Sequence, residues 1–203
     1  MARPNAGTKG VPRLDRESQI LEIASAQFGT LGFAATSVAA IADRAGISKP
    51  LIYNYFGSKE GLYEACLDRG GALVAEEIER IAREGSVGIE RGMQTLGGLF
   101  TLLEPQPYLW RLFFDPTAPS TGPIADSVTL YADRIGKLAE EGVAELMVLA
   151  GNSDELDISA MTTVWMGIVD SLVGWWLDHP GETAEEMIQR CLRLLEALFG
   201  DHT

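Results

Sequence analysis

Apolar residues recur every three or four positions along nearly the whole chain, and no segment shows the strict alternation of a β-strand. The pattern therefore predicts an all-α fold, which 203 residues can build around one sizeable core or two small ones. Breaks rich in Pro, Gly, Ser and Asp, such as EPQP and GNSDELD, separate the periodic stretches. The longer expected helices cover residues 13–31, 59–83, 87–103, 108–114, 124–149, 158–179 and 183–199.

Charge is distributed unevenly along the chain, whose net charge is −13. Residues 1–60 carry seven Lys/Arg and five Asp/Glu, whereas the remaining 143 residues carry nine and 24. A mildly basic N-terminal segment on an acidic body would approach DNA with the basic end first. The acidic body by itself indicates mainly solubility.

The chain is expected to be cytoplasmic, without a membrane partner. Its first ten residues are polar and lack the apolar run of a signal peptide. The most apolar region, residues 164–177, is interrupted by Asp170 and Ser171 and falls short of an uninterrupted membrane span. Two widely separated cysteines, Cys66 and Cys191, indicate no disulfide framework.

Residues 37–59 read SVAAIADRAGISKPLIYNYFGSK and predict two short helices that cross at a tight turn. Thr36 or Ser37 would cap the first helix, Ala42 is small where the helices approach, and Gly46 can adopt the positive φ of the turn. Pro50 suits the first turn of the second helix. The shared core would consist of Ile41, Ala45, Ile47, Ile52 and Phe56.

The remaining residues of the second short helix are not needed for this core and would form a polar and aromatic surface. They are Ser48, Lys49, Leu51, Tyr53, Asn54 and Tyr55. Such groups suit phosphate binding and base reading in a major groove. An ordinary helical hairpin with a solvated face is the alternative, and the spacing of Ala42 and Gly46 does not decide between the two. The two exposed tyrosines and the following Lys59 favour DNA.

The ordered string of residues resembles the DNA-binding domain of the TetR family of bacterial transcriptional regulators. It runs through Phe28–Gly32–Phe33, Thr36-Ser37-Val38, Ile41-Ala42, Ala45-Gly46-Ile47-Ser48-Lys49, Tyr53-x-Tyr55-Phe56 and Ser58-Lys59-Glu60-x-Leu62. The resemblance covers residues 13–67, about a quarter of the chain. It implies a flexible tail over residues 1–12, a three-helix helix-turn-helix domain over 13–62, and an effector-binding and dimerisation domain over 63–203.

The resemblance also implies roles for individual residues. Lys49, Tyr53, Tyr55 and Lys59 match positions that bind phosphate or a guanine edge. Leu51 departs from the small or hydroxylated residue usual there, so it favours a thymine methyl over a hydrogen-bonded contact. The complete set of expected DNA contacts is Ser37, Val38, Arg44, Ser48, Lys49, Pro50, Leu51, Tyr53, Asn54, Tyr55 and Lys59.

Residues 158–179 and 183–199 are apolar around most of their helical circumference, so they must be buried on more than one side. They predict a two-fold interface of four helices, which the resemblance also implies; a monomer with a thick core is the alternative. A homodimer would place two reading helices about 34 Å apart, on the half-sites of a palindromic operator. The expected interface residues are Ile168, Leu172, Trp176, Cys191, Leu195 and Leu198.

The resemblance further implies a ligand pocket among the middle helices, with Trp110, Phe113, Phe114, Trp165 and Val169 as its expected lining. Acidic surroundings suit an apolar or cationic effector. We therefore expect a repressor that a small molecule releases from its operator, and the alternative is a helical ligand-binding or interaction protein without specific DNA binding. An enzyme is not expected, nor a metal or cofactor, because the two histidines, His179 and His202, have no spaced partner.

Overall fold

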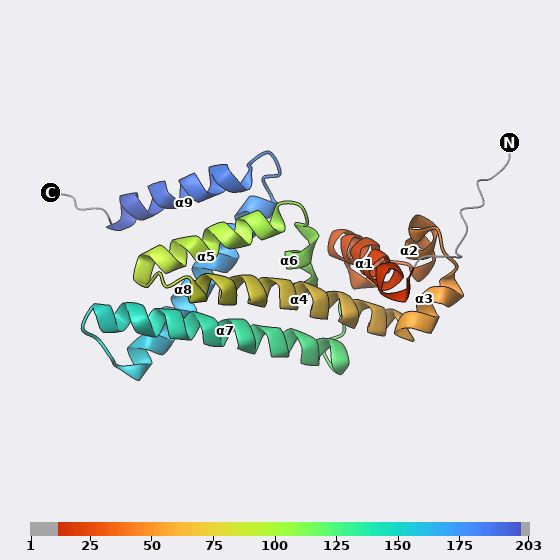
Figure 1. Cartoon of the computed structure of the whole chain (residues 1–203), viewed down its shortest axis with the longest axis horizontal. Helices are drawn as coiled ribbons and strands as arrows, with labels where there is room; N and C mark the ends of the chain where they lie inside the picture. Colours follow the sequence, from red (N-terminus) through yellow and green to blue (C-terminus); the bar gives the residue numbers. More distant parts are fainter. Residues whose placement is uncertain (1–11, 200–203) are drawn as a thin grey trace. The chain divides into compact units, whose positions relative to one another are not determined.

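The computed structural model describes residues 12–199, with side chains up to Ala197. Nearly all of the predicted tail, residues 1–12, lies outside the described residues. Within them, nine α-helices and no β-strand are present, which confirms the predicted all-α class (Figure 1). The helices are α1 (Arg13–Ala35), α2 (Val38–Ala45), α3 (Lys49–Phe56), α4 (Lys59–Arg83), α5 (Gly88–Leu103), α6 (Tyr108–Phe113), α7 (Pro123–Leu149), α8 (Glu155–Leu177) and α9 (Ala184–Phe199).

The chain packs as two compact units. The first contains the residues up to Gly71 together with Tyr108–Thr129, and the second contains Ala72–Pro107 and the residues from Leu130 onward. Helices α4 and α7 contribute to both. The predicted domain boundary at residue 62 also lies inside α4, and it stays a prediction.

The core of the first unit is built where α1, α2, α3, the start of α4 and α6 meet. Tyr63 of α4 lies at its centre, with its ring edge-on to Phe28 at 4.9 Å and to Phe33 at 5.2 Å between centroids. Gly29 allows α1 to lie directly against the Tyr108 backbone at the start of α6, where a side chain would not fit. Helix α6, which the sequence places in the sensing domain, therefore packs in the same unit as the helix-turn-helix.

Helix α1 breaks at Gly32, whose φ is +80°, and one further turn follows up to Ala35. This agrees with the prediction that Gly32 ends the main helix. The amides exposed by the break are bound by the segment after α6: Phe33 N–H donates to the Asp115 carboxylate, and Ala34 N–H donates to the Thr117 hydroxyl at 3.1 Å. The Tyr63 hydroxyl donates to the Leu112 carbonyl at 2.8 Å. Hydrogen bonds thus fasten α6 to α4, and the loop after α6 to the end of α1.

The second unit packs α5 along α9, with the remainder of α4, α7 and α8 completing it (Figure 1). Phe100 of α5 and Trp176 of α8 form an edge-to-face pair with ring centroids 5.2 Å apart. The guanidinium of Arg134 on α7 binds Glu79 on α4 at 2.6 Å. An aromatic core contact and a partly buried ion pair therefore join four of the helices that this unit contains.

Candidate nucleic-acid interface

Helices α2 and α3 form a tight helix-turn-helix. The Ser37 hydroxyl caps α2 by accepting from Ala39 N–H at 3.2 Å, so Ser37 rather than Thr36 is the cap. Gly46 ends α2 with a φ of +65°, as predicted from its place in the turn. The Ile47 amide then donates back to the Ala42 carbonyl at 3.0 Å. Three residues, 46–48, separate the two helices.

Helix α3 buries one side and exposes the other. Ile52 is completely buried, together with Ile41 and Ala45 of α2, while Ile47 and Phe56 are half-buried. The opposite side exposes Ser48, Lys49, Pro50, Tyr53 and Asn54, with Leu51 and Tyr55 half-buried beside them. The residues predicted to face DNA on α3 therefore share one accessible face.

Two groups at the start of α3 are suited to bind phosphate. The Lys49 ammonium lies 5.5 Å from the centre of the Tyr53 ring, a cation–π distance that holds the charge on the exposed face. Ser48 occupies the cap position of α3, but its hydroxyl makes no capping hydrogen bond. A hydroxyl and an ammonium at a helix N-terminus are a favourable setting for an anion.

Three of the residues that were predicted to contact DNA have side chains that pack or bind within the protein itself. The Val38 side chain is only 5% exposed and belongs to the core, so a contact from Val38, which stays a prediction, would have to come from its amide at the start of α2. The buried Gln27 amide faces Arg44 and, with its oxygen toward the guanidinium, accepts from Nε at 2.8 Å. The Lys59 ammonium lies 4.4 Å from the Phe33 ring centre and 3.5 Å from the Ala34 carbonyl oxygen. Arg44 and Lys59 therefore help to hold α1 against the motif.

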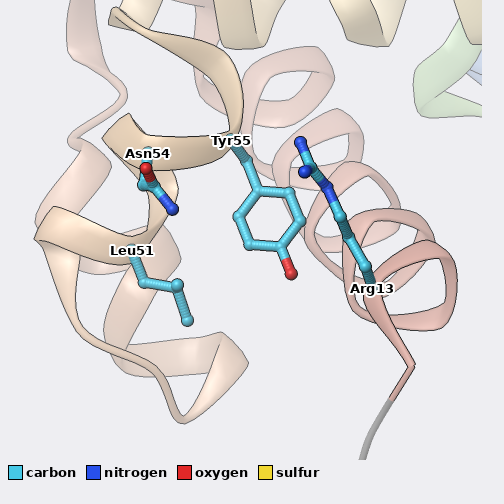
Figure 2. Close-up of a pocket in the computed structure, with 4 residues that line it drawn as sticks. All are labelled: Arg13, Leu51, Asn54 and Tyr55. Carbon is cyan, nitrogen blue, oxygen red and sulfur yellow. The ribbon is translucent and has the colours of Figure 1, made fainter.

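Arg13 was missed by the sequence analysis. It lies in the first turn of α1, and its guanidinium carbon sits 5.4 Å from the centre of the Tyr55 ring. Arg13, Leu51, Asn54 and Tyr55 line a hollow on this face (Figure 2). No local signal marks Arg13, because only the tertiary packing of α1 brings it beside α3.

Burial and hydrogen bonds shift the pKa values of three ionisable groups in the first unit. Burial raises the pKa of the Cys66 thiol to about 12, so the thiol stays protonated and unreactive. Burial, with the nearby Asp115 carboxylate, also raises the pKa of Tyr63. Partial burial alone would raise the pKa of Asp115, but hydrogen bonds from Thr117, Phe33 and Tyr63 outweigh it and lower that pKa. The Asp115 carboxylate is therefore charged at neutral pH where it holds the end of α1.

The residues predicted to line a ligand pocket fall into both units. The ring centroids of Trp110, in α6, and Phe114, just after it, lie 5.5 Å apart, and the Phe114 side chain is 59% exposed. Phe113 lies against Gly70. In the second unit, Trp165 packs over Gly92 of α5 and Val169 is buried. Their joint role in one pocket stays a prediction.

The predicted dimer residues differ in accessibility. Ile168 is 41% exposed, and Leu172 and Leu195 are half-buried. Trp176 and Cys191 are instead buried by their own chain, because they point to the inner side of α8 and α9, so they offer a partner no surface. The Leu198 side chain lies outside the described residues. Other large apolar side chains are exposed on these two helices: Leu156, Met161, Val164, Trp175, Leu192 and Leu194.

A tight helix-turn-helix whose second helix exposes one face is the motif that DNA-binding proteins of the helix-turn-helix class share. Residues 20–66 match the family described as bacterial regulatory proteins, tetR family. Over these residues the chain is similar to the TetR family of regulators.

Two curated proteins show the same likeness over part of their length. The HTH-type transcriptional activator FasR of Mycolicibacterium smegmatis is 33% identical over 116 residues, covering 56% of this chain and 53% of that protein. The HTH-type transcriptional regulatory protein RaaS of Mycobacterium tuberculosis is 48% identical over 65 residues, covering 32% of this chain and 28% of that protein. The chain thus spans about half or less of the length of these two curated relatives.

Solved structures match over a longer range. A TetR-like transcriptional regulator from Rhodococcus sp. RHA1 is 27% identical, with a TM-score of 0.65 over 91% of this chain and 99% of that one. The regulator FadR from Bacillus subtilis, solved in complex with stearoyl-CoA, has a TM-score of 0.74 over the same shares of both chains. At 19% identity, the second likeness concerns the fold alone.

Proposed function

We propose that this protein is a ligand-responsive repressor that binds a palindromic DNA operator as a homodimer. The observation that carries the proposal is the accessible face of α3, on which Lys49, Tyr53 and Asn54 stand exposed over a buried Ile52. An ammonium, a phenol and an amide on one short helix are the groups that bind phosphates and base edges. The similarity of residues 20–66 to bacterial regulatory proteins supports the same role.

Exposed apolar residues on α8 and α9 support the homodimer. By length and composition alone, α8 could cross a membrane, and only 11% of its most apolar window is buried within the chain. However, Trp176 on its inner side packs against Phe100 of the same unit, and Asp157 and Asp170 lie within the helix. A helix with one side in a protein core and an exposed apolar remainder is typical of a protein interface. We therefore assign the exposed side to a second copy of the chain, in the cytoplasm.

The effector we propose is a small apolar or cationic molecule. Strong negative charge outside the N-terminal region disfavours an anion, and aromatic side chains such as Trp165 on α8 offer apolar surface. A protein of the same fold holds stearoyl-CoA, whose acyl chain is apolar although its CoA part is anionic, so this likeness supports only the apolar character of the effector. Binding would release DNA only if the effector prefers the conformation that cannot bind the operator.

We propose repression rather than activation of transcription, because occupying an operator requires only DNA binding and dimerisation, the two activities that the described surfaces support. A reporter gene placed behind the operator distinguishes repression from activation directly. Expression should fall when the protein is present. A rise in expression would overturn the assignment as a repressor while leaving DNA binding intact, as for the relative that is named an activator.

Selection of bound duplexes from a random DNA library, at two salt concentrations, tests DNA recognition. We expect one palindrome to be enriched, with half-sites about one helical turn apart and an affinity that falls steeply with salt. The Lys49→Ala variant should lose this enrichment while remaining dimeric. Wild-type protein that enriches no sequence would instead support a helical ligand-binding protein without specific DNA recognition.

A further inference from the structure

The hollow between the N-terminus of α1 and helix α3 combines an apolar floor with polar edges. Leu51 and Asn54 are three residues apart on α3 and therefore lie on the same side of the helix. Tyr55 contributes a half-buried ring, and Arg13 closes the hollow from α1, with its guanidinium over that ring (Figure 2). The four side chains thus present an aliphatic group, an aromatic face, an amide and a cation to one small space.

This combination is selective for one kind of base pair. Thymine is the base that shows a methyl group in the major groove, and an aliphatic side chain is its natural contact. The amide of an asparagine pairs with N6 and N7 of adenine in a bidentate contact. A guanine or cytosine edge would place polar groups against Leu51 without a hydrogen-bonding partner. The hollow therefore favours A·T pairs on both grounds.

Arg13 is placed to bind the backbone rather than a base. Its guanidinium is held over Tyr55 at the α1 side of the hollow, away from Leu51 (Figure 2). Among the described residues, the Tyr55 hydroxyl has no hydrogen-bond partner within the protein, so it is free to donate to an anion. The hydroxyl lies at the far end of the ring from the guanidinium (Figure 2), so a phosphate at the guanidinium would gain a charge-assisted contact of its own next to the base-reading side chains.

We propose that this hollow reads a thymine in each operator half-site, with the methyl group against Leu51 and the Tyr55 ring, Asn54 on a neighbouring adenine, and Arg13 on the flanking phosphate. The inference rests on the proposed DNA-binding function. It adds to that function a specificity-determining hollow and a contact from α1. Leu51 determines the base through the methyl group, whereas Arg13 contributes affinity without sequence preference.

Replacing single thymines of the selected operator by deoxyuridine removes the methyl group and nothing else. The substitution should weaken wild-type binding about fourfold when it is made in one half-site and about fifteenfold when it is made in both, as expected for losing one buried methyl per half-site. In the Leu51→Ser variant, which keeps the Tyr55 ring, the preference for thymine over deoxyuridine at that position should fall well below fourfold. Circular dichroism and sizing establish that the variant is folded and dimeric.

Arg13 is tested separately by salt dependence. The Arg13→Ala variant should bind all duplexes more weakly and lower the slope of log affinity against log salt by about 1.8, for two phosphates per dimer. The matched control is Arg16→Ala, which removes the same charge one turn along α1, where Arg16 hydrogen-bonds Gln19 at 2.7 Å outside the hollow. The control should leave the slope unchanged.

The outcomes separate this inference from the proposed function. Specific binding with no deoxyuridine-sensitive thymine, or with a sensitivity that is undiminished in Leu51→Ser, would overturn the reading of thymine while leaving DNA recognition in place. Equal slopes for Arg13→Ala and wild type would overturn the phosphate contact. If wild-type protein enriches no duplex at all, the proposed function fails and the hollow has no base to read.

Discussion

Replacing Gly29 by alanine tests the packing that fastens α6 to the DNA-binding helices. A Cβ atom built on Gly29 would lie 2.7 Å from the Tyr108 Cβ and 2.9 Å from the Tyr108 carbonyl carbon. Ordinary contacts between carbon atoms are about 3.5–4.0 Å, so α1 and the start of α6 would have to separate by about 1 Å. The carbonyl carbon and the carbonyl oxygen of Tyr108, which also lies in the way, belong to the backbone and cannot rotate away.

The magnitude follows from two opposing effects. Overpacking of a well-packed core costs about 1–3 kcal/mol, and a rigid backbone obstacle corresponds to the upper end. Alanine in place of glycine within a helix returns about 1 kcal/mol. The net change is a loss of about 2 kcal/mol in the free energy of unfolding. For a chain of this size, Tm should fall by about 4–8 °C.

The assay is unfolding by heat and by urea, followed by circular dichroism. Gly70→Ala is the matched control, because Gly70 is a buried helical glycine that faces α6 from α4. Its added Cβ would lie 3.5 Å from Leu109 and 3.6 Å from Phe113, which are ordinary contacts. The control should be as stable as wild type or up to about 1 kcal/mol more stable. A Gly29→Ala protein as stable as wild type would refute the close approach of α1 and α6.

Three further predictions concern the loop after α6, a buried thiol and the dimer. Asp115→Asn should destabilise the protein by about 1–2 kcal/mol at neutral pH, measured by urea titration. Because the pKa of Asp115 is lowered in the folded protein, this difference should be present above pH ~3.8 and disappear as the pH falls through the folded pKa. A difference in stability that does not depend on pH would contradict the role of the charge. Cys66 should resist Ellman's reagent at pH 8 in the native protein and react on unfolding, and rapid native labelling would show that its site is open. Ile168→Asp should dissociate the dimer in sedimentation velocity while Leu130→Asp, at an exposed position of α7, should not; dimers of equal stability would move the interface elsewhere.

Much of the helical architecture could be predicted from local signals. Glycines at 32 and 46 end helices with positive φ, and both were identified from their positions between periodic segments. Helix α8 begins at Glu155, three residues before the expected start. The overlooked signal was Asp154, whose carboxylate accepts from the amides of Leu156 and Asp157 as an N-cap.

What could not be predicted depends on contacts distant in the sequence. Helix α6 packs with α1 because Gly29 permits close approach and Asp115 binds the Phe33 amide 82 residues away. Arg13 could not be predicted for the same reason, because only the folded chain places it beside Tyr55. A helix that is apolar on several sides does not reveal which side faces its own core, and for this reason Trp176 was assigned to the dimer surface although its own chain buries it.

The central claim is that the α3 faces of two protomers bind successive major grooves, and hydroxyl-radical footprinting on the selected palindrome tests it most directly. Wild-type protein should protect two short patches about one helical turn apart, on one face of the duplex, with two protomers per site. Tyr53→Ala, which removes an exposed side chain of α3, should abolish both patches while the protein stays dimeric. A single protected patch, or protection that persists in the variant, would contradict the account.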